Sequence, residues 1–455
     1  MSTELKHIYL HNAHCKTLLE NIEQGKKENH ISGISGAAIS FLISAVTHQT
    51  KKFQLVIAPD KEKAAYLLND LEALVDKEEV MFLPESYRRA YDTEETDNAN
   101  VLMRTEALNA ISQNKASIVV TYPNAICEKV MTILEIQNRK LTLKAGENVD
   151  YDFILDVLIE YDFDRDDFVY EPGQFAARGG IIDVFSFAHN LPIRIEFNGN
   201  KVESIRSFNP DTQLSVNNFE AIDILPNIER KDKNEIRQSL LEFIPENSIV
   251  WVYDEKQIQE VLNHFYKKAE DNFEKLSGEI KRTDPKDLFL TETDFKTQIN
   301  KFSSIYWGPQ QENTKSILFN TGGQPPFQKN FDLLLDDLTN KKNEFYTSYI
   351  FTDQVKQMER IFSIFDELLK KKGILDGANS PWLFEPASAV GLNQHIFAPH
   401  FFSIHEGFVD HDLKIACYTD HQIFERYKRF SLKASFSKEQ SITIKEGSLP
   451  CFVCL

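Results

Sequence analysis

Residues 170–211 read YEPGQFAARGGIIDVFSFAHNLPIRIEFNGNKVESIRSFNPD, and their pattern predicts three consecutive β-strands. The first is the apolar run from Ile181 to Phe185. Residues 193–198 then alternate between apolar and polar side chains, which is the period of a strand with one buried face. Asn198-Gly199 supplies the positive-φ residues of a tight hairpin turn. The alternation falters near Glu203-Ser204, and this predicts a β-bulge.

The polar positions of these strands indicate what the sheet is for. Arg194, Glu196 and Asn198 share the polar side of the second strand. The three strands contain no constellation of nucleophile, base and acid. A small antiparallel sheet with arginines on its solvent face therefore indicates docking to a partner rather than chemistry.

The bulk composition narrows the class of protein. A chain of 455 residues holds roughly two to four domains. Its formal net charge of −18 argues against a surface that grips DNA throughout, because phosphate binding needs an excess of cations. The five cysteines follow no disulfide framework, which predicts a reducing, cytoplasmic location. The longest uncharged stretch near the N-terminus, residues 29–50, is too polar to span a membrane.

The N-terminal region, residues 1–138, reads as an α/β unit in which short apolar strands alternate with amphipathic helices, a pattern typical of a parallel sheet. Gly33 and Gly36 stand where a nucleotide-binding unit places its phosphate loop. Ala37-Ala38 follow in place of the lysine and hydroxyl residue that contact phosphate and magnesium. We favour a tight glycine turn before a buried helix, with a residual anion site as the alternative.

The rest of the chain is expected to form an inserted docking domain at 139–226, the second part of the first module at 227–326, and a small α/β domain at 330–428. A Gly-Pro-rich linker at 322–326 and a tail at 429–455 complete the division. The predicted fold class is therefore α/β and multidomain: a degenerate helicase-like domain of the P-loop type with an inserted antiparallel α+β domain, then a second α/β domain.

Two groups of residues have metal-ligand chemistry without a recognised ligand spacing, so we predict no metal and no cofactor in this chain. The first group comprises His405, Glu406, Asp410, His411 and Asp412 and is interpreted as a solvated loop. The second, Cys451 and Cys454, is half of a zinc site with no second pair.

Residues 171–185, EPGQFAARGGIIDVF, resemble the signature of transcription-repair coupling factors, which is shared more loosely with the excinuclease B subunit of bacterial nucleotide excision repair. The similarity continues through PIRIEF at 192–197, SIR at 204–206 and DTQ at 211–213, and extends to supporting segments over residues 1–445. In that family this region is a degenerate copy of the excinuclease B core that has lost ATP chemistry.

The resemblance also implies a partner and its contacts. The inserted domain of the family recruits the excinuclease A subunit, and its binding arginines correspond to Arg178, Arg194 and Arg206. Asn198 occupies the position where some relatives carry a contacting aromatic residue. Phe197 is the neighbour expected to compensate.

Family members are far longer and continue into an RNA-polymerase-binding module, two translocase domains that use ATP and magnesium, and a C-terminal domain that covers the docking face. The resemblance thus implies a non-catalytic docking fragment that binds constitutively. RNA polymerase and DNA would be contacted by the missing domains, and residues 447–455 are expected to be a non-family tail after a truncation.

Two other functions remain open from the sequence. One is a nucleotide-dependent DNA-processing enzyme that uses the Gly33–Gly36 loop. The other is a DNA-binding fragment with a basic stripe through Lys428 and Arg429.

Overall fold

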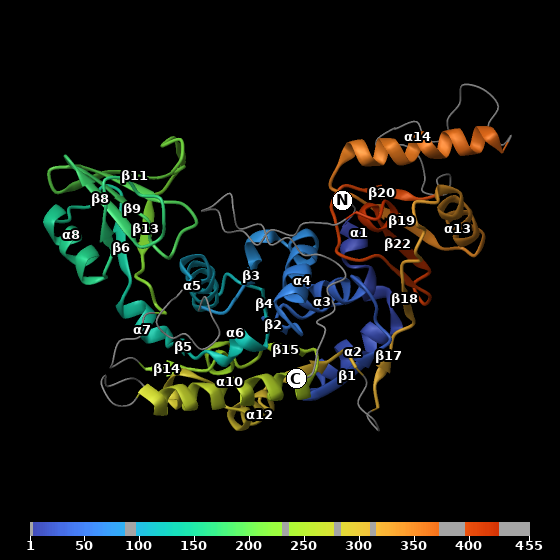
Figure 1. Ribbon diagram of the computed structural model, residues 1–455, viewed down its shortest axis with the longest axis horizontal. Helices are drawn as coiled ribbons and strands as arrows, with labels where there is room; N and C mark the ends of the chain where they lie inside the picture. The colour runs from blue at the N-terminus through green and yellow to red at the C-terminus, as the bar shows by residue number, and fades with distance from the viewer. Residues whose placement is uncertain are drawn as a thin grey trace.

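The computed structural model describes residues 3–86, 97–229, 236–276, 284–309, 315–372 and 396–426. Three sheets dominate it, one in each of three units that lie side by side (Figure 1). The α/β multidomain class predicted from the sequence is confirmed. The predicted tail, with Lys428 and Arg429, lies outside the described residues.

The central unit is built on a seven-stranded sheet with the order β17-β1-β16-β15-β2-β4-β3, in which every pairing is parallel. Its strands are β1 (Glu28–Ser32), β2 (Gln54–Ile57), β3 (Val80–Phe82), β4 (Ile118–Thr121), β15 (Ile249–Val252), β16 (Ser303–Tyr306) and β17 (Ile317–Leu318). Strands β2, β4 and β15 are buried along their whole length, as apolar runs covered on both faces by helices require. Chain segments from both sides of the inserted unit thus complete one sheet.

Helices cover this sheet, and several are capped by acidic or amide side chains. Asp60, for example, accepts a hydrogen bond from the backbone N–H of Lys63 at 2.8 Å and starts α4. The helices are α1 (Thr3–Lys6), α2 (Ala13–Glu23), α3 (Ala38–Thr50), α4 (Lys61–Leu74), α5 (Asn98–Ser112), α6 (Pro123–Cys127), α7 (Ile133–Asn138), α9 (Leu240–Phe243), α10 (Glu255–Leu276), α11 (Pro285–Leu288) and α12 (Glu292–Ile299), with 3₁₀ turns at Ile8–His11 and Lys77–Glu79.

The inserted unit, green in Figure 1, carries a six-stranded sheet of order β12-β11-β10-β9-β8-β7, antiparallel except between β7 and β8. Its strands are β7 (Asp164–Arg165), β8 (Gln174–Arg178), β9 (Ile181–Val184), β10 (Ile193–Asn198), β11 (Lys201–Phe208) and β12 (Ser215–Asn218). Helix α8 (Tyr151–Glu160) packs on one face. The predicted bulge is confirmed: Glu196 pairs with Ser204 and Phe197 with Val202, which leaves Glu203 unpaired.

Two short pairings join the inserted unit to the central one. Strands β6 (Leu141–Lys144) and β13 (Ala221–Ile224) run antiparallel where the chain enters and leaves the unit. Nearer the central sheet, β5 (Val130–Met131) pairs with β14 (Arg237–Gln238).

The third unit has a five-stranded sheet with the order β18-β21-β22-β19-β20. Its elements are β18 (Thr321–Gly323), α13 (Phe331–Asn343), β19 (Thr347–Phe351), α14 (Val355–Lys371), β20 (Ala398–His400), β21 (Phe408–Asp410), β22 (Ile415–Thr419) and α15 (Asp420–Ile423). Strand β18 includes Gly322 and Gly323 of the stretch predicted as a linker, and it pairs antiparallel with β21.

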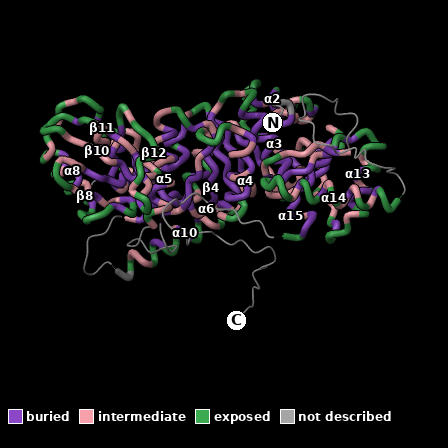
Figure 2. The backbone as a smooth tube through the Cα atoms, turned by 90° about the horizontal axis from the view of Figure 1, so that it is seen from above, coloured by how far each residue is buried: buried purple, intermediate pink, exposed green. Residues whose placement is uncertain are grey.

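Buried residues run through all three units (Figure 2). The largest apolar cluster includes Phe351, Phe408 and Cys417 of the third unit together with the central sheet, so these two units share a core. Within the described residues, no helix is long and apolar enough to cross a membrane.

Candidate docking site

The register of the inserted sheet places the predicted arginines on one face. Arg194 on β10 lies directly across from Asp183 on β9 and from Arg206 on β11. In the adjacent row, Arg178 on β8 pairs with Ile181, and Ile181 pairs with Glu196. Directly paired residues of an antiparallel sheet project to the same side. Three arginines and two carboxylates therefore share the face opposite α8.

Asp183 is the centre of this group. Its Oδ1 accepts a hydrogen bond from Arg194 Nε at 2.6 Å, and its Oδ2 accepts one from Arg194 Nη2 at 2.7 Å. Arg178 Nη2 donates to the same Oδ2 at 2.8 Å. Arg194 Nη2 also donates to Gln213 Oε1 at 3.0 Å. The hydrogen bonds that Arg194 donates to Asp183 raise the pKa of Arg194 more than the charge of Asp183 does, so this guanidinium stays protonated. We call Arg178, Asp183 and Arg194 the docking cluster.

Arg206 has its own carboxylate partner on the same face. Its Nη1 donates to Glu196 Oε2 at 2.9 Å, and its Nη2 donates to Glu196 Oε1. These hydrogen bonds, with one from the Ser204 hydroxyl, hold the pKa of Glu196 below its usual value.

The three arginines are not equally accessible. The side chain of Arg178 is 45% exposed, while those of Arg194 and Arg206 are 18% and 24% exposed. The Arg178 guanidinium carbon lies 5.0 Å from the centroid of the Phe168 ring, and that of Arg194 lies 4.5 Å from the Phe208 ring. The predicted arginine face is thus internally paired, and Arg178 offers a partner the largest free edge.

The remaining two predicted contact residues lie apart. Asn198 is exposed at the end of β10, next to the hairpin turn. Phe197 projects to the opposite face, where it packs against the α8 side of the unit and its ring contacts Tyr151 edge-on at a centroid distance of 5.3 Å. Strand alternation puts Phe197 and Asn198 on opposite faces of the sheet, and compensation by Phe197 stays a prediction.

Backbone from other parts of the chain packs closely against the Gly33–Gly36 loop. Both glycines have positive φ, at 70° and 55°. A Cβ on Gly33 would collide with the Phe319 carbonyl oxygen, and a Cβ on Gly36 would lie 2.7 Å from the Gly407 carbonyl oxygen. The backbone N–H of Ala37, just before α3, donates to the Glu406 carbonyl oxygen at 3.0 Å. Backbone at Phe319 and at Glu406–Gly407 therefore packs against the two glycines and the start of α3.

The loop is also held from the side of β18. The backbone N–H of Ser35 donates to the Thr321 hydroxyl at 2.7 Å, and that hydroxyl donates to the Gly33 carbonyl oxygen at 3.0 Å. These contacts favour the glycine-turn interpretation over the residual anion site.

A buried ionic cluster at the base of the inserted unit was not predicted. Arg104 on α5 donates from Nε to Glu229 Oε1 at 2.8 Å and from Nη1 to the Pro84 carbonyl oxygen at 2.6 Å. Arg237 on β14 donates to Glu229 Oε2 at 3.3 Å, and Glu128 lies 3.6 Å from Arg104. All four side chains are at most 4% exposed. We call Arg104, Glu128, Glu229 and Arg237 the root cluster.

The two carboxylates of the root cluster differ in their tendency to ionise. Burial raises the pKa of Glu128 to about 7, with Arg104 opposing and Glu229 adding to the shift. Burial also acts on Glu229, but the charges and hydrogen bonds of Arg104 and Arg237 outweigh it and lower the pKa. The root cluster therefore holds one firmly ionised carboxylate, Glu229.

Of the five residues interpreted as a solvated loop, His411 and Asp412 are exposed, whereas His405 forms an interdomain contact. His405 is not in a solvated loop: its side chain is 9% exposed and its Nδ1 lies 2.5 Å from Oδ2 of buried Asp70 on α4. The backbone N–H of His405 also donates to Asp70 Oδ1 at 2.7 Å. Asp410 accepts hydrogen bonds from the backbone of Asp412 and Leu413. The described residues contain no group of three or more ligand side chains placed to hold a metal.

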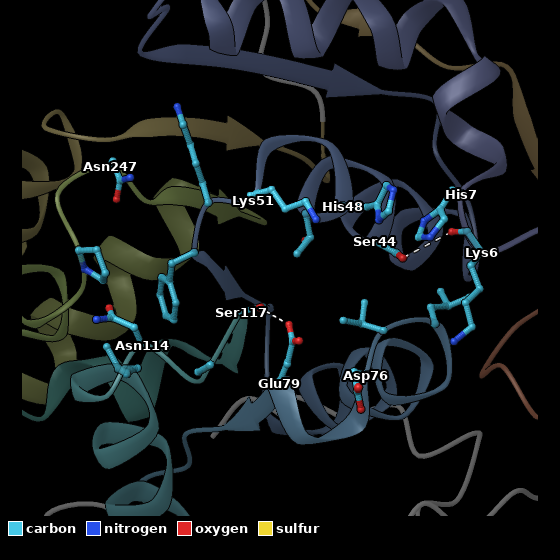
Figure 3. A pocket seen from close by; sticks show the side chains of 18 residues that line it. Lys6, His7, Ser44, His48, Lys51, Asp76, Glu79, Asn114, Ser117 and Asn247 are labelled. Carbon is cyan, nitrogen blue, oxygen red and sulfur yellow. Dashed lines mark hydrogen bonds between the residues drawn. The ribbon is translucent and has the colours of Figure 1, made fainter. Parts of the chain in front are cut away.

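A cavity of about 530 Å³ opens at the edge of the central sheet where β2, β3 and β4 begin (Figure 3). Lys51 and the stacked rings of His7 and His48 line it on one side, and Asp76 and Glu79 on another. Its serines are engaged elsewhere: the hydroxyl of Ser117 donates to Glu79, and that of Ser44 to the Lys6 carbonyl oxygen. Both serine hydroxyls are therefore bonded to groups other than the two histidines.

Comparison with known proteins agrees with the geometry. Residues 141–229 match the sequence profile of the UvrB interaction domain. The transcription-repair-coupling factor of Bacillus subtilis (strain 168) is 29% identical over 212 residues, which is 46% of this chain and 18% of that protein. The corresponding protein of Staphylococcus aureus (strain MSSA476) is 32% identical over 203 residues, 44% of this chain and 17% of the relative.

A structure of the DEAD-box helicase Mss116 bound to ssRNA and UDP-BeF aligns over 80% of this chain and 56% of that chain, at 10% identity. Its TM-score of 0.22 is too low to bear on fold or function. The matched part of the chain spans less than a fifth of the length of the two relatives. The resemblance to transcription-repair coupling factors inferred from residues 171–185 is confirmed, and the sheet that carries the docking cluster lies inside the match to the UvrB interaction domain.

Proposed function

We propose that this chain is a docking module that recruits the excinuclease A subunit of nucleotide excision repair through its inserted unit. The observation that carries the proposal is the position of the docking cluster within the match to the UvrB interaction domain. In the full-length protein, this module would bring repair enzymes to RNA polymerase stalled at DNA damage in the cytoplasm.

The chemistry of the docking cluster suits an acidic partner surface. Guanidinium groups bind carboxylates through two parallel N–H···O bonds, and such pairs are among the stronger polar contacts between proteins. Asp183 accepts two hydrogen bonds from one edge of Arg194, but only one, from Nη2, from Arg178. The exposed remainder of Arg178 is the contact we expect a partner carboxylate to make.

We infer that the module does no ATP chemistry itself. Ala37 and Ala38 are fully buried, and the loop before them is bonded to the backbone of Glu406 and to Thr321. ATP, magnesium, DNA and RNA polymerase would act in the longer protein, as an ATP-dependent DNA translocase that displaces stalled polymerase.

The direct test is a binding titration of this chain with the excinuclease A subunit. We expect saturable binding by wild type and a large loss in Arg178→Glu. The matched control is Arg360→Glu, because Arg360 is an equally charged, exposed residue on α14 of the third unit. Equal affinities for wild type and Arg178→Glu would remove Arg178 from the docking surface, and no binding by wild type would overturn the proposed function.

The rival function, a nucleotide-dependent enzyme, makes a separate prediction. It requires saturable heat of ATP binding by calorimetry, with and without magnesium. We expect none. A saturable signal that disappears in Ala37→Glu would restore the nucleotide hypothesis. Binding to DNA is tested by a gel shift at low and moderate salt, because attraction to the backbone alone falls steeply with salt.

A further inference from the structure

We propose that Asp183 is a positioning residue, which holds Arg178 and Arg194 together as one preformed receptor for a partner carboxylate. This inference rests on the proposed function and deepens it. Asp183 itself does not touch the partner, because its side chain is only 2% exposed. Its effect on binding would be exerted through the two arginines.

The first step is the geometry around Asp183. It sits in β9, the strand between β8 and β10, and pairs with Ala176 on one side and Arg194 on the other. Both carboxylate oxygens are occupied by guanidinium N–H groups, with three hydrogen bonds between 2.6 and 2.8 Å. Asp183 therefore orients two cations on neighbouring strands with one buried group.

The second step concerns the other contacts that fix the two guanidinium groups. Arg194 is fixed by three contacts: Asp183, the Gln213 amide oxygen at 3.0 Å, and the Phe208 ring at 4.5 Å. Arg178 has Asp183 and the Phe168 ring. An arginine side chain gives up rotamer freedom when it is ordered, so ordering it before binding removes that cost from association.

The third step distinguishes two possible roles of Asp183: positioning the arginines, or only offsetting their positive charge. Asp183 leaves the docking cluster with one net positive charge, and Asp183→Asn would leave it with two. If Asp183 only offset charge, its removal would strengthen attraction to an acidic partner. If Asp183 positions the arginines, its removal would weaken binding although the net charge has become more favourable. The two roles therefore predict opposite signs.

The experiment titrates the full chain with the excinuclease A subunit at several salt concentrations, for wild type, Asp183→Asn and Glu160→Gln. At about 0.15 M salt we expect Asp183→Asn to weaken binding by about ten-fold. Its affinity is also expected to depend more steeply on salt than that of wild type, because a net positive charge has been added. Glu160→Gln adds the same charge at an exposed position of α8, on the side opposite the docking cluster, so we expect it to bind like wild type.

A second variant keeps the test valid if Asp183→Asn does not fold. Gln213→Asn shortens the side chain that holds Arg194 and retains a residue type that tolerates the φ of 59° at this position. We expect a two- to four-fold loss of affinity with unchanged thermal stability. If wild type binds and Asp183→Asn binds equally or more tightly, Asp183 is not a positioning residue and the proposed function stands. If wild type does not bind, the proposed function fails and this inference fails with it.

Discussion

The docking cluster and the root cluster use the same chemistry in opposite surroundings. Each pairs arginines with a buried carboxylate that accepts from two guanidinium groups, Asp183 in one case and Glu229 in the other. In the root cluster both arginines are nearly inaccessible, at 0% and 4% exposure, whereas Arg178 of the docking cluster is 45% exposed. Both clusters contain ion pairs, so the ion pair alone does not identify a docking surface. The exposure of the guanidinium group distinguishes a surface for a partner from a structural contact.

The largest expected effect comes from breaking the root cluster. Glu229→Gln would leave Arg104 and Arg237 buried without their firmly ionised partner. Removing one side of a buried ion pair costs about 3–5 kcal/mol. We expect a loss of this size in urea unfolding, whereas Asp183→Asn is expected to lose less. Equal losses in the two variants would abolish the distinction between the clusters.

The next effect concerns binding rather than folding. Arg178→Glu is expected to weaken the excinuclease A complex by roughly 2 kcal/mol, as loss of an interface anchor does. Because the Arg178 side chain is 45% exposed and makes one hydrogen bond to Asp183, the unfolding free energy of this variant is expected to change less than that of Arg194→Glu. Arg194→Glu is a poorer probe, because it would place a carboxylate against buried Asp183 and disturb the sheet as well. Binding is measured by titration and stability by thermal unfolding. A drop in stability without a drop in affinity for Arg178→Glu would assign Arg178 a structural role.

A smaller effect is expected at Glu128 and depends on pH. Burial raises its pKa from 4.5 to about 7, so the folded state retains a proton that the unfolded chain releases. Wild type therefore loses stability relative to Glu128→Gln as the pH rises from about 4.5 to about 7. Urea unfolding of both proteins at several pH values measures this. A stability difference that grows in favour of wild type over this range would show that Glu128 is ionised in the fold.

The smallest effect is the response to salt. Interactions between exposed charges are screened over about 8 Å at physiological ionic strength, and buried pairs much less. We expect affinity for the partner to fall with added sodium chloride, while the stability cost of Glu229→Gln stays nearly constant. Salt dependence of that cost as steep as that of binding would mean that water reaches the root cluster.

The sequence placed Arg194 on the polar face of a strand, whereas it predicted neither Asp183 nor any member of the root cluster, and the difference has a physical reason. Residues 193–208 contain the strand alternation, the Asn198-Gly199 turn and the bulge at Glu203. These local patterns predict both the strands and the face on which Arg194 lies. The same alternation shows that Phe197 points away from the arginines.

The root cluster and the filling of the glycine loop depend on long-range contacts that no local pattern reports. Arg104 and Glu229 are 125 residues apart and each looks like an ordinary surface charge in the sequence. His405 meets Asp70 across 335 residues. The absence of a lysine after Gly36 predicted a loop without phosphate chemistry, but not the backbone of Glu406 and Gly407 that fills it.

The filled glycine loop has a mechanical consequence. In nucleotide switches, a segment is ordered while phosphate is bound and released when it leaves, so occupancy is converted into motion. Here the N–H of Ala37 donates instead to the backbone carbonyl oxygen of Glu406, which belongs to the same chain and does not leave as a ligand would. The loop is therefore a permanent contact between the central and third units. Any swing of the docking surface is therefore expected at the paired strands β6 and β13, the stem on which the inserted unit stands.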